Sequence, residues 1–255
     1  QVASSRFEVE TGTYDIGVTG ILPGENAEVL QADVTLEADM NYDIFAVGNV
    51  ADESLSLLTV TSNETAVEAG NAQVQIVHAA SMAPTVDIYV TAPDTDITAE
   101  QPLVTAEFTD STDLIQVPAG DYQIRITPAG ETTVVYDSGT VNLADGADLL
   151  IAATNNVGTG ESPVTLLAAD GDGSFKIWDT EAGAAIRVVH GISDAPAVDV
   201  IANNEIVLVD GIQFPRTTDY LSVAAGDYLI DVVADSDSSV VAIDDAELSL
   251  EVGMS

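Results

Sequence analysis

The sequence predicts an all-β protein made of tandem immunoglobulin-like antiparallel β-sandwich repeats. Runs of roughly four to eight residues rich in Val, Ile, Thr and Tyr recur between clusters of Gly, Asp, Asn and Pro, which is typical of short strands and turns. The phrase IVHAASMAPTVDIYV around His78 returns as VVHGISDAPAVDVIA around His190. A second phrase occurs three times, as FEVETGTYDI from Phe7, LIQVPAGDYQI from Leu114 and YLSVAAGDYLI from Tyr220. The period of about 110 residues is the size of one sandwich domain.

The repeats divide the chain into three predicted domains. Residues 69–180 contain both phrases and are predicted to form the complete β-sandwich repeat 2. Residues 1–68 contain only the second phrase, so we expect the second half of repeat 1 there, and residues 181–255 are expected to form the first part of repeat 3 without its last strands. Two interpretations remain open. Either the chain is a segment of a longer array, or neighbouring molecules supply the missing strands, because an open sheet edge can accept an added strand.

Within repeat 2 the short runs rich in Val, Ile, Thr and Tyr between turn residues predict seven or eight strands. Their expected ranges are 72–78, 86–91, 103–108, 114–117, 121–128, 134–141, 149–154 and 164–168. The acidic, glycine-containing segments 62–71 and 170–184 are predicted to be short linkers between repeats.

One tyrosine occupies the same position in each copy of the second phrase. These are Tyr14, Tyr122 and Tyr228, each just after a turn. In sandwich proteins a tyrosine at such a corner packs its ring inward and bonds its hydroxyl to nearby backbone. We therefore predict a structural role for all three.

The composition indicates a globular chain with an acidic surface. Five basic residues stand against 43 acidic ones, for a formal net charge of −38, while 46% of the residues are hydrophobic. Such a surface repels nucleic acid and anionic lipid, and no apolar run is long enough for membrane insertion. We expect an extracellular or cell-surface location, in a halophilic or marine setting where salt screens the self-repulsion.

The two histidines are interpreted as scaffold rather than as catalytic groups. Ser81 and Asp87, three and nine residues after His78, supply the residue types of a triad, but Ser193 and Asp199 recur in the same way after His190. A nucleophile elbow of the GxSxG type is missing. We therefore expect no catalytic site and no enzyme activity.

Calcium is the one cofactor that the sequence suggests. In the stretch DGDGSFKIWDTE, Asp170, Asp172, Ser174 and Glu181 stand at positions one, three, five and twelve of a calcium-loop spacing. Flanking helices are not predicted, so the alternative interpretation is a solvated acidic linker. Comparable aspartate clusters at 94–96, 235–237 and 244–245 are interpreted as turns.

The phrases VHAASMAPTVDIYV and VVHGISDAPAVDVIA, followed by the tyrosine phrase, resemble the domain of unknown function 4397 family. The resemblance covers repeats 2 and 3 and the second half of repeat 1. It implies an exported, tandem β-sandwich array, and it implies no catalytic residues.

These observations predict a secreted structural repeat protein. It would be the subunit or segment of an extracellular filament, a surface layer or an adhesin stalk, and it would assemble through sandwich contacts or strand complementation. The expected partners are copies of itself in a head-to-tail polymer or adjacent repeats of a longer chain. The alternative is an accessory module that binds carbohydrate or another surface ligand through loops at one end of a sandwich.

Overall fold

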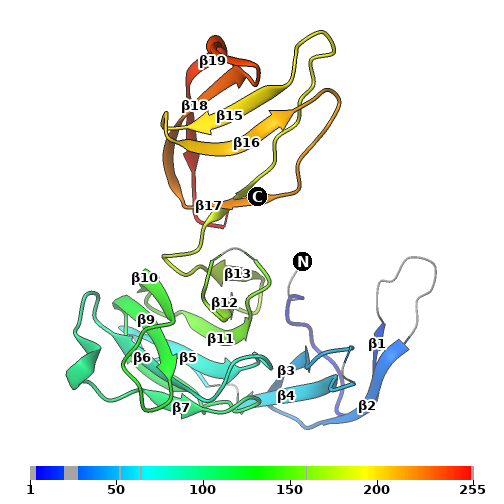
Figure 1. The fold of residues 1–255 in the computed structure, drawn as a ribbon. Helices are drawn as coiled ribbons and strands as arrows, with labels where there is room; N and C mark the ends of the chain where they lie inside the picture. Colours follow the sequence, from blue (N-terminus) through cyan, green and yellow to red (C-terminus); the bar gives the residue numbers. More distant parts are fainter. Residues whose placement is uncertain (1–3, 20–27, 52, 64, 159, 254–255) are drawn as a thin grey trace. The chain divides into compact units, whose positions relative to one another are not determined.

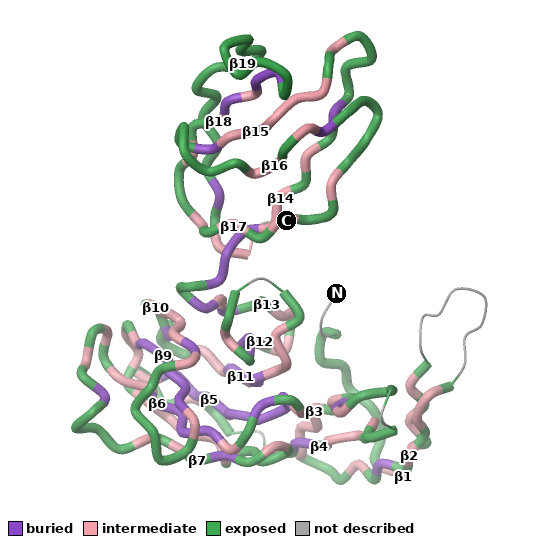
Figure 2. The backbone as a smooth tube through the Cα atoms, in the orientation of Figure 1, coloured by how far each residue is buried: buried purple, intermediate pink, exposed green. Residues whose placement is uncertain are grey.

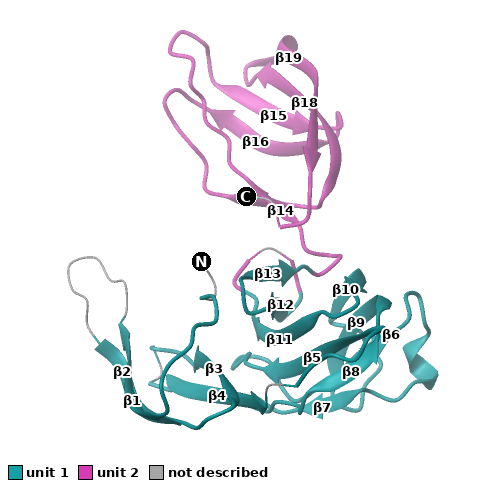
Figure 3. Cartoon of the chain, turned by 180° about the vertical axis from the view of Figure 1, so that it is seen from behind, with its two compact units in different colours: residues 1–156, 162–178 teal, residues 157–161, 179–255 magenta. Residues whose placement is uncertain are grey.

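A computed structural model describes residues 4–19, 28–51, 53–63, 65–158 and 160–253 (Figure 1). The chain forms two compact units, and each is described here by itself (Figure 3). Unit 1 comprises Gln1–Asn156 and Ser162–Trp178, and unit 2 comprises Val157–Glu161 and Asp179–Ser255. The predicted repeats 1 and 2 thus lie mainly in unit 1, and the predicted repeat 3 lies in unit 2.

The described residues of unit 1 form thirteen strands and one short 3-10 helix, η1 (Ile97–Ala99). The strands are β1 (Gly12–Thr19), β2 (Glu28–Leu36), β3 (Met40–Val47), β4 (Ser56–Asn63), β5 (Asn71–His78), β6 (Val86–Thr91), β7 (Val104–Ala106), β8 (Ile115–Pro118), β9 (Gly120–Pro128), β10 (Tyr136–Leu143), β11 (Asp148–Asn155), β12 (Val164–Ala169) and β13 (Ser174–Ile177). No described helix of the protein is both long and apolar enough to cross a membrane.

Strands β5 to β13 form a sandwich of two sheets. One sheet has the order β10-β9-β6-β7, and the other has the order β13-β12-β11-β5-β8. The all-β sandwich prediction is confirmed, with one departure from a purely antiparallel arrangement: β5 and β11 pair in parallel, with Ile76 opposite Ile151. Parallel neighbours require a long crossover, which here contains the whole segment from β6 to β10.

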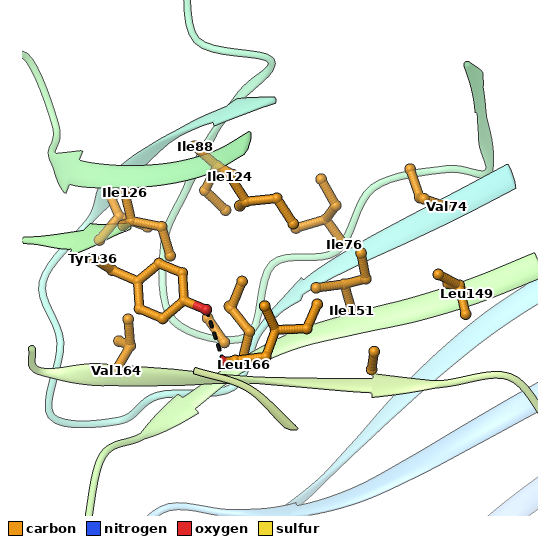
Figure 4. Close-up of a cluster of buried hydrophobic side chains, with 14 of the residues drawn as sticks. Val74, Ile76, Ile88, Ile124, Ile126, Tyr136, Leu149, Ile151, Val164 and Leu166 are labelled. Atoms are coloured by element: carbon orange, nitrogen blue, oxygen red, sulfur yellow. Dashed lines mark hydrogen bonds between the residues drawn. The ribbon is translucent and has the colours of Figure 1, made fainter. Parts of the chain in front are cut away.

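The sandwich core lies between the two sheets and is lined by alternate residues of each strand (Figure 4). Ile76 of β5 and Ile151 of β11 face Ile124 of β9. Tyr136 is completely buried, and its hydroxyl donates to the carbonyl of Ile177 at 2.8 Å. Figure 2 shows the buried residues concentrated along β5, β6, β9 and β11. Burial of these aliphatic faces is the main stabilising term of the unit.

The prediction of a linker over residues 170–184 is wrong in part, because strand β13 lies within this segment. Ser174–Ile177 is a fifth strand of its sheet and pairs antiparallel with β12, with Ile177 opposite Leu166. Ile177 is buried whereas Phe175 and Lys176 are exposed, so a short apolar contact was sufficient to order a segment whose acidic composition indicated a linker. The predicted linker 62–71 also overlaps the end of β4 and the first residue of β5.

The hairpin of β3 and β4 packs on the outer face of the sandwich, away from the main core. Its Val47 and Val60 contact Val77 and Ala79 of the sandwich, together with Ala152 of β11. Val60 and Val77 are 1% and 0% exposed. Residues of the predicted repeats 1 and 2 therefore share a second apolar core.

Unit 2 is a more open structure, with six strands among its described residues. These are β14 (Ala184–Ile186), β15 (Val198–Ala202), β16 (Ile206–Ile212), β17 (Leu221–Val223), β18 (Gly226–Ala234) and β19 (Asp237–Leu250). Four form a sheet in the order β16-β15-β18-β19, and β14 pairs with β17. The order matches β7-β6-β9-β10 and β5-β8 of unit 1, so unit 2 repeats the first six strands of the complete sandwich.

The first hairpin of the chain repeats the register of a later one. Gly12 pairs with Leu36 between β1 and β2, and Gly226 pairs with Leu250 between β18 and β19. The hairpin β1–β2 is therefore the counterpart of β18–β19 and, by the repeat, of β9–β10. The hairpin β3–β4 follows it as β11–β12 follows β9–β10.

Candidate functional site

The histidine of the repeated phrase clamps the loop that follows its strand. His78 Nε2 lies 3.0 Å from the carbonyl oxygen of Pro84, and the N–H of Ala80 donates to His78 Nδ1 at 3.3 Å. A carbonyl can only accept, so these partners require the proton on Nε2 and a free lone pair on Nδ1. The ring is fully buried and lies edge-on to Phe108, with 6.4 Å between ring centroids.

Unit 2 contains the same clamp. His190 Nε2 lies 3.0 Å from the carbonyl of Pro196, and the N–H of Ile192 donates to Nδ1 at 3.4 Å. Both rings therefore use both nitrogens for backbone groups of their own loop.

The residues that would complete a triad bond elsewhere. The hydroxyl of Ser81 accepts from Asn155 Nδ2 at 3.1 Å, and the carboxylate of Asp87 accepts from the N–H of Gly130 at 2.8 Å. Neither is a hydrogen-bond partner of His78. The arrangement orders loops, and it does not form the chain of nucleophile, base and orienting carboxylate that acyl transfer needs.

The predicted tyrosine corners are confirmed in all three repeats. Each hydroxyl donates to the carbonyl four residues before it: Tyr14 to Glu10 (2.7 Å), Tyr122 to Pro118 (2.7 Å) and Tyr228 to Ala224 (2.8 Å). The glycine two residues before each tyrosine has a positive φ between 151° and 159°, a backbone conformation that residues with a side chain rarely adopt.

The acidic loop between β12 and β13 is closed by its first aspartate. Asp170 Oδ1 accepts from the backbone N–H groups of Gly173 (2.9 Å) and Asp172 (3.1 Å). Both bonds hold the pKa of the Asp170 carboxyl below its usual value, and the bond from Gly173 has the larger effect. The N-terminal segment lies on this loop, because Arg6 donates its N–H to the Gly171 carbonyl at 2.6 Å.

The four predicted calcium ligands come from both units. Asp170, Asp172 and Ser174 belong to unit 1, and Glu181 belongs to unit 2, where its N–H donates to Asp179 Oδ1 at 2.6 Å. Calcium binding by these four residues therefore stays a prediction.

Closer carboxylate groups occur in unit 2, where oxygens of three side chains lie within 4.8 Å of one another. The two groups are Asp199 with Asp210 and Asp235, and Asp231 with Asp244 and Asp245. In each group one carboxylate already accepts a backbone N–H: Asp199 from Gly211 and Asp231 from Asp245, both at 2.8 Å. The sequence did not suggest these groups, because each gathers residues from separate strands or turns.

The outer face of β9 has a buried polar layer that alternation alone did not predict. Arg125 and Thr127 are 9% and 0% exposed although they point away from the core. The segment after β6 contributes to this cover, since the N–H of Asp94 donates to Gln123 Oε1 at 2.8 Å. Arg125 Nη2 donates to the Thr91 hydroxyl at 2.8 Å. Among the described groups, Arg125 Nε and Thr127 Oγ1 have no hydrogen-bond partner.

A half-buried carboxylate lies on β3, near the second apolar core. Burial raises the pKa of Asp43; the charge of Arg6 works against this effect, and the charge of Asp148 adds to it. Asp148 stands at the start of β11, so charges from both predicted repeats act on the same carboxyl.

The inner face of the unit 2 sheets has a shallow apolar groove. Its lining includes Ile186 of β14, Tyr228 and Ile230 of β18, and Leu248 and Leu250 of β19. Their equivalents in unit 1 belong to the closed core between the sheets.

Comparison with known proteins gives one family. No curated protein matches the chain. The family model described as Domain of unknown function (DUF4397) matches residues 1–89 and 184–255. This match covers more than half of the sequence and includes both histidine clamps and two of the three tyrosine corners. The chain therefore belongs to the DUF4397 family.

Proposed function

We propose that the protein is a structural repeat protein, a segment or subunit of an extracellular filament, surface layer or adhesin stalk. The observation that carries the proposal is the second apolar core, in which Val60 of the predicted repeat 1 packs against Val77 of the predicted repeat 2. Buried aliphatic contacts between repeats stiffen a tandem array, whereas repeats joined only by linkers would move independently.

The surface composition supports an external setting. With 43 acidic and five basic residues, neighbouring copies repel one another at low ionic strength, and salt shortens the range of this repulsion to about 8 Å near physiological ionic strength. Divalent cations are attracted to such a surface as well. Assembly should therefore depend on salt, and calcium should promote it more than a monovalent salt does.

Electron microscopy in the native salt, combined with sedimentation at increasing protein concentration, tests the proposal. We expect regular filaments or sheets with an axial repeat set by the chain, together with growth of the sedimenting species as salt or calcium is added. A protein that stays monomeric at high concentration, with and without calcium, would contradict the assembly role. Specific signals on a glycan array would instead favour the carbohydrate-binding alternative.

A further inference from the structure

The two units carry opposite charges at one buried position of their sheets. The segment AGDYQIRIT, which includes most of β9, aligns with AGDYLIDVV, which includes most of β18, so Asp231 stands where the complete sandwich has Arg125. Arg125 is 9% exposed and Asp231 is 6% exposed. By alternation both side chains point to the outer face of the sheet, because Ile230 beside Asp231 lines the inner groove.

In unit 1 the charge at this position lies in a layer that contains its own partners. Arg125 lies opposite Asp137 of β10, and the amide of Gln123 donates to both carboxylate oxygens of Asp137, at 2.8 and 2.9 Å. Counted back from the leucine that pairs with the first glycine of each hairpin, Asp244 is the counterpart of Asp137 in unit 2. Leu229 replaces Gln123 there. Unit 2 therefore keeps the acid but lacks both the opposing guanidinium and the amide donor.

A β-bulge brings a third carboxylate to the same position. Strands β18 and β19 are neighbours in the sheet (Figure 1), and their register shifts at Asp231, so that both Asp244 and Asp245 lie opposite it. A bulge of this kind re-aims a side chain that plain alternation would send to the other face. Oxygens of the three carboxylates lie within 4.8 Å of one another.

Among the described residues, the Asp231 carboxylate has no partner outside this group. Its hydrogen bond, on Oδ1, comes from the N–H of Asp245 at 2.8 Å. Unit 2 contains two arginines and no lysine. Neither Arg187 nor Arg216 belongs to the four-stranded sheet, and Arg187 lies over the ring of Tyr220. A buried carboxylate without a counter-charge is strongly destabilising, and like charges on facing strands add to the cost. A cation from solution would supply the missing charge.

We propose that Asp231, Asp244 and Asp245 bind a calcium ion, at the position that the guanidinium of Arg125 takes in unit 1. Oxygens on opposite sides of a calcium ion are about 4.6–5.2 Å apart, because each lies about 2.3–2.6 Å from the metal. The spacing of the three carboxylates, within 4.8 Å, therefore lets all of them contact one ion.

Calcium suits this group better than magnesium does. Ca²⁺ accepts about six to eight oxygen ligands in irregular geometry, whereas Mg²⁺ needs a nearly regular octahedron and gives up its water reluctantly. Asp244 and Asp245 are exposed whereas Asp231 is buried, so water can reach the remaining coordination positions from the outer side. The site lies within one chain, and it does not depend on the assembly proposed above.

The second acidic group of the same sheet provides a matched control. Asp199 is half-buried, and its counterpart in unit 1, Asp87, is also an aspartate. Relative to unit 1, this group has therefore lost no cation. Asp210 and Asp235 are both exposed, so replacing them by Asn removes two surface charges near the proposed site and leaves its ligands in place.

Calorimetric titration of the full chain with calcium, after treatment with a chelator, tests the site. High monovalent salt in the buffer suppresses the diffuse attraction of cations to the acidic surface. Asp231→Asn removes the buried charge at nearly constant volume, and we expect it to weaken calcium binding by about tenfold or more. The Asp210→Asn, Asp235→Asn double variant should bind within about twofold of the native chain. The predicted loop at Asp170 is intact in every variant, so binding there cancels in the comparison.

Thermal unfolding gives a second measurement, in which the sign of the effect changes with calcium. Without calcium, Asp231→Asn should unfold at a higher temperature than the native chain, because the buried repulsion is gone. Millimolar calcium should raise the unfolding temperature of the native chain more than a monovalent salt of equal ionic strength does, and it should not do so for the variant. Asp231→Arg restores the side chain of unit 1 and should likewise remove the response to calcium.

Three results would overturn the site. The first is equal calcium affinity of the native chain and Asp231→Asn. The second is an equal loss of affinity in the Asp210→Asn, Asp235→Asn variant, which would leave only diffuse attraction to the surface. The third is a monovalent salt that reproduces the whole effect of calcium on unfolding. All of these measurements are made on single chains, so a failure to form filaments would contradict the assembly role and leave the calcium site standing.

Discussion

The imidazole of His78 lies 3.0 Å from the carbonyl of Pro84 and is completely buried beneath the loop that it holds. The same contact recurs between His190 and Pro196. A side chain that would attract attention as a catalytic base therefore works as a loop clamp, once in each copy of the phrase.

Replacement of His78 by Ala should destabilise unit 1 by about 2–4 kcal/mol, because it leaves a cavity and removes a buried hydrogen bond. Chemical denaturation followed by the fluorescence of the single tryptophan and by circular dichroism measures the change. Met82→Ala in the same loop is the control, since its side chain is 76% exposed, and it should change stability by less than about 0.5 kcal/mol. Equal effects of the two substitutions would contradict the clamp.

The tyrosine hydroxyls should differ in their contribution to stability. Tyr136→Phe removes a buried bond to the Ile177 carbonyl and should cost about 1–3 kcal/mol, because an acceptor without water or partner is left behind. Tyr122→Phe removes the corner bond to Pro118, which water can replace at the partly exposed site, and should cost about 0.5–1.5 kcal/mol. Urea unfolding of the two variants compares them, and a larger loss for Tyr122→Phe would be inconsistent with the burial.

Asp43→Asn should stabilise the protein at neutral pH. Burial raises the pKa of Asp43 in the folded state, so the folded protein binds this proton more tightly than the unfolded chain does. The stability linked to this group is present at low pH and is lost as the pH rises through the raised pKa. Thermal unfolding at a series of pH values should show an advantage of the Asn variant at neutral pH that shrinks on acidification. An advantage that grows toward low pH would have the wrong sign.

Asp170→Asn should have the opposite pH dependence. Backbone N–H groups lower the pKa of Asp170, and the group of Gly173 has the largest effect. The stability that this carboxylate contributes is therefore present above the ordinary aspartate pKa and is lost as the pH falls through the lowered value. The variant should be less stable than the native chain at neutral pH and equal to it in strong acid. The difference should be small, because the carboxyl is exposed to solvent. The same variant, measured with millimolar calcium against a monovalent salt of equal ionic strength, checks the predicted calcium loop.

Much of the local structure could be predicted from the pattern of residues. The alternation in β5, β6 and β9 and the Gly-Asp-Tyr turns specify strands and corners through contacts between residues close in the chain. The three tyrosine bonds to the carbonyl four residues back are of this kind. Strand β13 was not predicted because a single buried residue, Ile177, holds it in place. Ile177 pairs with β12, and its carbonyl accepts a hydrogen bond from Tyr136.

Partners that are distant in the chain could not be predicted in the same way. Strands β5 and β11 pair in parallel, with Ile76 opposite Ile151, although the segment from β6 to β10 separates them in the sequence. No local pattern in the sequence distinguishes β11 from another apolar strand as the neighbour of β5. The carboxylates of Asp231 and Asp245 likewise meet only because β18 and β19 pair.

The sequence by itself determined the all-β class, the repeat, the corner tyrosines and the acidic surface, since each depends on composition or on neighbours within a few residues. The tertiary structure decided which strands pair, that the histidines bond to loop carbonyls, and that β3–β4 packs on the back of the next sandwich through Val60. These depend on which apolar faces remain uncovered after the strands have formed, and burial of such faces is a property of the whole fold.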